Sequence, residues 1–381
     1  MQELYKYIVI FLQIFKVNSI GFFRTPKVPR FEHEWWGPTH LKYNNDTSIR
    51  PFQIHFSEEM ILDLRYRLKN TRSCTPPLKG VNFEYGFNTD HLQGWLDYWA
   101  DHYPFQQQEL YLNQFPQFKT NIQGLDIHFL WVKPDVPFTV ETVPLLLMHG
   151  WPGSVREFYE TLPMLTAISP DRDFAVEVIA PSLPGFGFSD PAVRPGLGTS
   201  EMAVVLRNLM HRLGFKKFYV QGGDWGAVIG QDMATIFPKL FSTGSRRRYY
   251  NRNDGGFSEL FTREELIDNL MIYWMTNSFT TSARIYAEFA NLRTLRMGIF
   301  AIPTPVPTWA IQAKDEIIYQ SPTLLRQKFP NLVNTTVLNT GGHFLAFELP
   351  RVFANDVLNA ISAFRSWHYH NKLNKKKYGL S

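Results

Sequence analysis

Three polar residues stand at the ends of three predicted strands, in an order that suits nucleophilic catalysis. Asp224 follows the segment FYVQGG, Glu316 ends the segment PVPTWAIQAKDE, and His343 follows the segment TTVLNTGG. In an open sheet flanked by helices, functional side chains gather outside the carboxyl ends of the strands, so we expect these three to lie close together. Two carboxylates and a histidine in one place can act as nucleophile, acid and base.

The segment GGDWG around Asp224 predicts a sharp turn from a strand into a helix, with an aspartate where such turns usually present a nucleophile. A carboxylate is ionised at neutral pH and can attack an sp³ carbon without a base, which gives an ester on the protein. His343 would then activate water against that ester, while Glu316 orients the imidazole. Backbone N–H groups of Trp225 and of the segment HGWPGS (149–154) are placed to stabilise the oxyanion.

Each of these features has a simpler interpretation on its own. Asp224 could cap the helix that follows it, Glu316 could be a surface charge, and His343 could be an ordinary histidine beside the core. The segment HGWPGS could be a tight turn with no further role. Four such features in the order found in an α/β-hydrolase, each at a strand end, favour the catalytic interpretation.

The composition indicates a folded protein with a sizeable core. The chain has 381 residues, 44% of them hydrophobic, enough for one large domain or two modest ones. The net charge of +5 is modest, and we expect no nucleic-acid partner; the run SRRRYYNR (245–252) is interpreted as a solvated loop. Cys74 is the only cysteine and the histidines lack zinc-type spacing, so we expect no disulfide framework, no metal and no cofactor.

Strands that alternate with helices follow an early pair of helices. Those two helices are predicted over residues 57–70, with Ser57 as N-cap, and 89–103. Apolar runs and alternation predict strands at 126–134, 143–150, 174–185, 218–220, 305–316 and 335–344, and further helices at 201–214 and 350–367. The pattern predicts the α/β class, an α/β-hydrolase fold with a mostly parallel sheet and a helical N-terminal subdomain.

The motifs HGWPGS, GGDWG and GGHFLAFELP resemble the signatures of microsomal-type epoxide hydrolases, and the insect branch that opens juvenile hormone is the nearer match. The resemblance covers most of the chain, from WWGP near its start to LRQKFPNLVNTTVLNTGGHF near its end. It implies a hydrophobic epoxide as substrate and a diol as product.

The resemblance also assigns roles to individual residues. It makes Asp224 the nucleophile, His343 the base and Glu316 its acidic partner. Tyr286 matches a lid tyrosine that donates a hydrogen bond to the epoxide oxygen. The expected substrate contacts are Trp151, Trp225 and Phe344, with Trp151 and Trp225 also stabilising the oxyanion through their backbone.

The chain departs from the family directly after the nucleophile helix. Residues 234–257 contain no convincing strand and pass into what resembles the later part of the lid. An internal deletion would remove one core strand and the lid segment that holds the family's second epoxide-binding tyrosine, leaving a truncated lid. We expect a gap beside the nucleophile strand, at a cost above a domain's net stability of about 5–15 kcal/mol, and impaired activity.

Two other functions fit parts of the pattern. A haloalkane dehalogenase also pairs an aspartate elbow with a histidine, and it would need halide-binding groups in place of Tyr286. A catalytically dead lipid-binding protein, or a truncated product without function, fits the missing strand.

Residues 5–23 are mostly apolar but interrupted by polar residues, and they predict either a membrane-spanning anchor or an amphipathic surface helix. Positive charges follow them, so we expect the catalytic body to face the cytoplasm. The resemblance to microsomal-type enzymes implies that the membrane is that of the endoplasmic reticulum (microsomal). The expected organisation is a possible anchor (1–23), an N-terminal helical region (24–125), the first half of the core (126–240), a residual lid (241–300), the second half of the core (301–370) and a basic tail (371–381).

Overall fold

The computed structural model describes residues 27–31, 33–137, 139–238, 261–316 and 319–377. The predicted anchor at residues 5–23 and the run at 245–252 lie outside these ranges. Within them, no helix is both long and apolar enough to cross a membrane.

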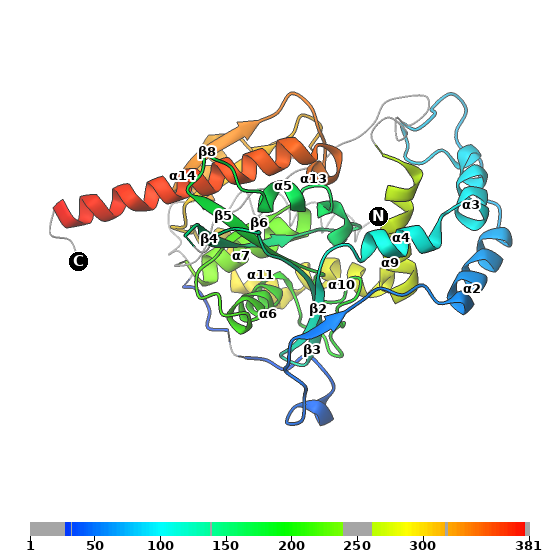
Figure 1. The fold of residues 1–381 in the computed structure, drawn as a ribbon, viewed down its shortest axis with the longest axis horizontal. Coiled ribbons are helices and arrows are strands. Elements are labelled where there is room, and N and C mark those ends of the chain that lie inside the picture. The colour runs from blue at the N-terminus through cyan, green and yellow to red at the C-terminus, as the bar shows by residue number, and fades with distance from the viewer. Residues whose placement is uncertain (1–26, 32, 138, 239–260, 317–318, 378–381) are drawn as a thin grey trace.

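Eight strands form two sheets in the described part of the chain (Figure 1). They are β1 (Arg50–Phe52), β2 (Gln117–Ile122), β3 (Leu125–Val132), β4 (Glu141–Met148), β5 (Phe174–Pro181), β6 (Tyr219–Gly222), β7 (Thr308–Gln312) and β8 (Leu332–Val337). The first six form one sheet in the order β1-β2-β3-β5-β4-β6, and β7 pairs with β8. The pairs β5–β4, β4–β6 and β7–β8 are parallel and the others antiparallel, so the predicted α/β class is confirmed with a mixed sheet.

Helices surround the sheets and form the N-terminal region and the lid. The N-terminal helices are η2 (Thr39–Leu41), α2 (Glu58–Lys69), η3 (Thr89–His91), α3 (Leu92–Asp101) and α4 (Phe105–Leu112). The core helices are η4 (Val155–Phe158), α5 (Leu162–Thr166), α6 (Thr199–Arg212), α7 (Asp224–Ile236), α12 (Pro322–Lys328), α13 (Leu345–Glu348) and α14 (Pro350–Lys377). The remaining helices are α9 (Arg263–Thr276), α10 (Phe279–Phe289), α11 (Leu292–Met297) and η5 (Ile299–Ala301).

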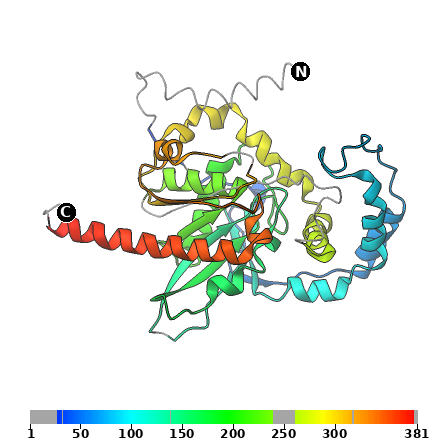
Figure 2. The same ribbon diagram turned by 90° about the horizontal axis from the view of Figure 1, so that it is seen from above.

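The two faces of the central sheet bury separate apolar clusters. Successive residues of a strand point to opposite faces, and β4 follows this rule with four fully buried side chains. Leu145 and Leu147 join a cluster with α5 and α14, whereas Leu146 and Met148 join one with α6 and α7. Both views show α14 running along the sheet, with its C-terminal end far from α2 and α3 (Figures 1 and 2).

The gap predicted beside the nucleophile strand is present in the described part of the chain. The larger sheet ends at β6, and no described strand joins it to the β7–β8 pair. A cavity of about 30 Å³ lies at this junction, between Tyr219 and Val220 of β6, Trp309 and Ile311 of β7, and side chains of α14.

The expected large void is not found among the described residues, because α14 packs against both sheets at the junction. Phe364 stacks on Tyr219 with ring centroids 6.2 Å apart. Asp356, also in α14, accepts hydrogen bonds from the indole of Trp309 on β7 and from the hydroxyl of Thr336 on β8. One helix therefore contacts both sheets. At about 24 cal/mol per Å³, the remaining cavity costs below about 1 kcal/mol.

The C-terminal helix is longer than predicted. It continues to Lys377 rather than ending near residue 367, and so includes part of the segment expected to be a tail. Residues 368–377 contain neither glycine nor proline, the two residues that most disfavour a helix interior. This composition explains why the helix does not stop where its apolar pattern does.

A buried ion pair fixes helix α9 to the core. Nε of Arg156, in η4, lies 2.9 Å from Oδ2 of Asp268, in α9, and the two side chains are 2% and 1% exposed. Glu160 accepts two further hydrogen bonds from Arg156, and the hydroxyl of Tyr103 donates one to Asp268. The N-terminal region, the core and α9 therefore meet at one polar cluster.

We expect Asp268→Ala to lower the free energy of unfolding by about 3 kcal/mol, because it removes the nearest partner of a buried guanidinium. Urea denaturation measures this change. The control is Asp63→Ala, which breaks an exposed pair with Arg67 and should change stability by about 0.5 kcal/mol or less. Equal losses in the two variants would contradict the role given to the buried pair.

Candidate active site

Asp224 occupies a sharp turn between β6 and α7. Its φ is +48°, in the left-handed region that residues other than glycine seldom adopt. Gly222 and Gly226 beside it must be glycines, because other backbone atoms lie too close for a Cβ at either position. A Cβ on Gly226 would lie 2.4 Å from the carbonyl oxygen of Met148, at the end of β4, and one on Gly222 would lie 2.3 Å from the carbonyl carbon of Gly226. The predicted strand–turn–helix elbow is confirmed.

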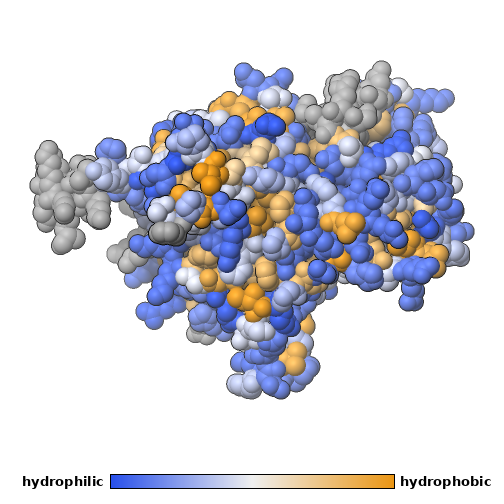
Figure 3. Space-filling model, in the orientation of Figure 1, coloured by the Kyte–Doolittle hydropathy of each residue, from blue (hydrophilic) through white to orange (hydrophobic). Residues whose placement is uncertain are grey.

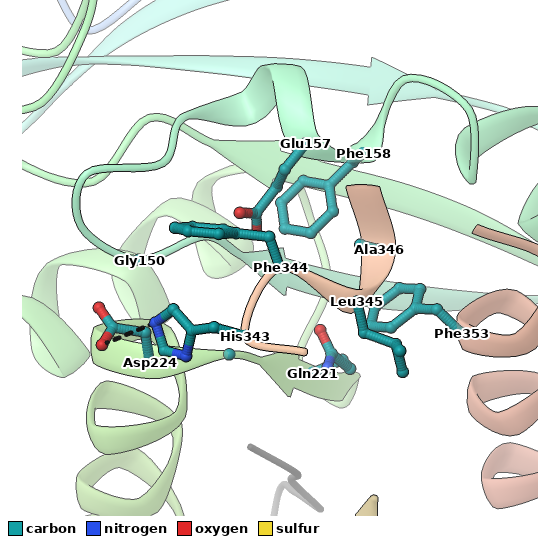
Figure 4. Close-up of a pocket in the computed structure, with 11 residues that line it drawn as sticks. Gly150, Glu157, Phe158, Gln221, Asp224, His343, Phe344, Leu345, Ala346 and Phe353 are labelled. Atoms are coloured by element: carbon teal, nitrogen blue, oxygen red, sulfur yellow. Dashed lines mark ion pairs between the residues drawn. The ribbon is translucent and has the colours of Figure 1, made fainter. Parts of the chain in front are cut away.

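The carboxylate of Asp224 makes two directed contacts. Oδ1 accepts a hydrogen bond of 2.8 Å from the backbone N–H of Trp151, and Oδ2 lies 3.3 Å from Nε2 of His343 (Figure 4). No side chain caps α7, so the interpretation of Asp224 as a helix cap is wrong. The carboxylate is held by the loop after β4 and by the histidine.

His343 and Glu316 complete the arrangement that the sequence predicts. Nδ1 of His343 lies 3.6 Å from Oε1 of Glu316, and the two side chains are 11% and 10% exposed. Burial lowers the pKa of His343, but hydrogen bonds to Asp224 and Glu316, with their charges, outweigh it and raise the pKa above its ordinary value. Three residues from three strand ends and two sheets therefore meet at one point.

Tyr286 approaches this point from α10, at the edge of a large pocket. Its ring packs edge-on against Trp225 at 4.8 Å and against Trp151 at 5.5 Å between centroids. The indole of Trp151 is itself fixed by a 3.2 Å hydrogen bond from Nε1 to Oγ of Ser282, one turn earlier in α10. Tyr286 and Trp151 line the same pocket as Asp224, as predicted.

Phe344 and Trp225 differ in their relation to that pocket. Phe344 lines it and packs edge-on against His343 with centroids 4.9 Å apart. Trp225 is buried behind Tyr286, where its ring also contacts Phe289, and it is not among the residues that line the pocket. Its indole supports the tyrosine, so the expected substrate contact is not shown. The role of its backbone N–H stays a prediction.

The large pocket has a volume of about 690 Å³ and an apolar lining. About half of its lining comes from α3, α9 and the segment before α3, and includes Trp95, Trp99, Leu266, Leu270 and Phe87. The face of the molecule shown in Figure 3 is mainly hydrophilic with scattered hydrophobic patches, unlike this lining. Pockets of this size and character bind small apolar molecules.

Several groups around the site were not singled out from the sequence. His149 is fully buried, and burial lowers its pKa to about 4. Its Nε2 accepts a hydrogen bond from the N–H of Leu183, and its Nδ1 donates one to the carbonyl of Gly150. These two bonds fix the neutral tautomer with the proton on Nδ1, next to the loop that follows β4. A Cβ on Gly150 would lie 2.4 Å from Cβ of Asp224. The motif HGWPGS contains both residues and is the signal that could have identified them.

Glu157 and Gln221 were also missed. Both line a small cavity beside Asp224 and His343 (Figure 4). A polar residue in an otherwise apolar strand was the available signal for Gln221. Among the described residues, no group of three or more His, Cys, Asp or Glu side chains is arranged to hold a metal ion.

Known proteins match the chain along most of its length. Residues 49–158 match the family described as epoxide hydrolase N terminus, and residues 143–245 match the alpha/beta hydrolase fold. The juvenile hormone epoxide hydrolase of Bombyx mori is 46% identical, over 89% of this chain and 92% of the relative. Epoxide hydrolase 1 of Oryctolagus cuniculus is 32% identical, over 86% and 91%.

The crystal structure of the juvenile hormone epoxide hydrolase from Bombyx mori superposes with a TM-score of 0.84, at 50% sequence identity. The match covers 88% of this chain and 99% of that chain. The Aspergillus niger epoxide hydrolase, at 22% identity and a TM-score of 0.69, shares the fold.

The length of the alignment with the Bombyx mori sequence agrees with the predicted internal deletion. The alignment spans 425 positions, whereas 89% of 381 residues is about 339, so about 86 positions have no residue in this chain. The comparisons nevertheless bear out neither impaired activity nor a dehalogenase, a lipid-binding protein or a truncated product without function. With 46% identity over most of both sequences, the chain belongs to the epoxide hydrolase family.

Proposed function

We propose that the chain hydrolyses a hydrophobic epoxide of the juvenile hormone type to its diol, through an ester on Asp224. The observation that carries the proposal is a carboxylate held between the N–H of Trp151 and the imidazole of His343, facing an apolar pocket. The pocket suits a long apolar ligand. Relatives named as juvenile hormone epoxide hydrolases in Bombyx mori and Ctenocephalides felis support the substrate class.

In the first step, Oδ2 of Asp224 attacks an epoxide carbon. Oδ1 is held by the N–H of Trp151, so Oδ2 is the oxygen that forms the new bond. The ring C–O bond breaks, and the departing oxygen receives a hydrogen bond from the hydroxyl of Tyr286, which stabilises its charge. This alkoxide then takes up a proton from solvent and becomes the first hydroxyl of the diol. The product of this step is an alkyl ester of Asp224.

In the second step, a water molecule adds to Cγ of that ester while Nε2 of His343 takes one of its protons. The charge that develops on Oδ1 is stabilised by the N–H of Trp151, and we include the N–H of Trp225 as a second donor. The tetrahedral intermediate then collapses, and the bond between Cγ and the oxygen that carries the alkyl group breaks. This oxygen receives the proton from His343. Asp224 is then a carboxylic acid that carries the second hydrogen of the water, and it loses this proton to solvent. The diol leaves and the carboxylate is restored.

Glu316 acts in the second step by orienting His343 and stabilising its protonated form. Formation of the ester removes the negative charge of Asp224, one of the two charges that raise the pKa of His343. The imidazole is therefore more basic before the first step than after it. Its neutral, proton-accepting form becomes more populated once the ester is present.

The proposal is tested by diol formation from a hydrophobic terpenoid epoxide, with the mass of the intact protein followed in parallel. The native chain should release diol, and Asp224→Ala should give neither diol nor adduct. His343→Gln should slow ester hydrolysis by about 10²-fold or more, so its mass should increase by that of one substrate. His370→Gln, an exposed histidine on α14, is the matched control. Diol from Asp224→Ala, or full turnover by His343→Gln, would contradict the mechanism.

A second test uses pH. Ester hydrolysis needs neutral His343, so its rate should fall as the pH drops through the pKa that this residue has in the ester. Because the ester lacks the charge of Asp224, that pKa should be lower than the raised pKa in the free protein. Single-turnover ester decay measures the first value, and NMR titration of His343 in the free protein measures the second. Two equal values would contradict the charge argument.

We also propose that residues 5–23 hold the protein at the endoplasmic reticulum membrane, with the catalytic body facing the cytoplasm. The apolar composition of this stretch and the positive charges of Arg24, Lys27 and Arg30 support the proposal. The full chain should sediment with microsomal membranes, and a chain that begins at residue 24 should not. Equal recovery of both in the soluble fraction would overturn this part of the proposal.

A further inference from the structure

We propose that Gln221 positions the water molecule that hydrolyses the ester, from a small cavity that Asp224 and His343 also line. The proposal rests on the proposed function and adds a residue that acts only in the second step. Three observations carry it: a cavity of the right size, an unpartnered buried amide oxygen, and a rigid strand position.

The cavity adjoins both groups that the second step uses. It has a volume of about 10 Å³, close to the room that one water molecule needs. Asp224 and His343 line it together with Gly150, Glu157 and Gln221. Gln221 does not line the large apolar pocket in which the substrate is placed. A water molecule here would therefore reach the ester without crossing the substrate.

The side chain of Gln221 is 7% exposed, and no donor among the described residues reaches its Oε1. Buried amide oxygens nearly always accept a hydrogen bond, so an unpartnered one beside a cavity indicates a missing donor of small size. In Figure 4 this oxygen points toward the segment that carries His343 to Ala346. Water is the donor that fits a cavity of this volume.

The backbone of Gln221 is held in register by the central sheet. It pairs with Leu147 of β4, and the next pair is Gly222 with Met148. Asp224 follows two residues after this pair, at the elbow. Gln221 and the carbon to be attacked are thus fixed by the same strand, which favours a constant geometry between them.

A second acceptor for the water would favour this step. A water molecule that donates one hydrogen to Nε2 of His343 and the other to Oε1 of Gln221 has a lone pair left for Cγ of Asp224. As the new O–Cγ bond forms, the first hydrogen moves to His343 as a proton and the second stays on the attacking oxygen. Without Gln221 the water could turn about its bond to His343, and productive orientations would be less frequent.

The test separates ester formation from ester decay by rapid quench and intact-protein mass measurement, with a hydrophobic terpenoid epoxide as substrate. Gln221→Met removes the acceptor at similar volume, so decay should slow by about tenfold to a hundredfold while formation changes by about twofold or less. Ester should then accumulate during turnover. Gln221→Glu, which keeps an acceptor oxygen, should recover most of the decay rate.

The control for a loss of stability is Gln117→Met. Gln117 is a buried glutamine of β2 in the same sheet and lines neither cavity, so the folded variant should form and hydrolyse ester as the native chain does. If Gln221→Met does not fold, Gln221→Asn keeps the amide but withdraws it by one methylene group, and it should show the same selective slowing of decay.

The outcomes distinguish this inference from the proposed function. If the native chain forms no ester, the proposed function fails, and the inference fails with it. If ester forms and Gln221→Met or Gln221→Asn hydrolyses it at the native rate, only the role of Gln221 is overturned. Equal slowing of formation and decay would assign Gln221 a structural role and would also overturn the proposal.

Discussion

The close approach of backbone segments around Asp224 is the constraint on which the rest of the structure depends. The elbow presses Gly226 against the carbonyl of Met148, and the loop after β4 presses Gly150 against the aspartate side chain. These contacts place the N–H of Trp151 on Oδ1. The positive φ of Asp224 costs of order 1–3 kcal/mol, and the buried sheet on both sides of the turn sustains it.

The second constraint is that the triad bridges an interrupted sheet. Asp224 follows β6, whereas Glu316 and His343 follow β7 and β8, which form a separate sheet in the described part of the chain. A hydrogen-bonded ladder therefore does not set the distance between nucleophile and base. On one face α14 contacts both sheets. On the other, Thr304 donates to the carbonyl of Ala234 in α7. Helices thus maintain a distance that a strand would otherwise fix.

The sequence predicted the triad and most elements because those features are local or follow from chain order. Ser57 caps α2 as expected, since its side chain accepts from the N–H of Met60. β1 and β2 were not predicted: the first has three residues with a proline at its centre, and the second, QFKTNI, carries mostly polar side chains. Their pairing depends on partners remote in sequence, which periodicity does not report.

The same limit applies to the site. The order of Asp224, Glu316 and His343 follows from strand ends, and the resemblance supplied Tyr286. Nothing local distinguishes Gln221 from a glutamine whose amide is satisfied, because its unpartnered oxygen is a property of the packed fold. The extent of the gap at β6 also depended on packing, since the sequence could not show that α14 would fill it.

Asp224 adjoins two separate spaces, and this separation suits the two steps of the proposed reaction. The carboxylate lines both the apolar pocket with Tyr286 and the small cavity with Gln221. An apolar substrate in the pocket displaces water from the attacking oxygen, which strengthens the nucleophile. A water molecule held in the small cavity can reach Cγ without occupying the space of the epoxide. A site with one shared space would favour only one of these two steps.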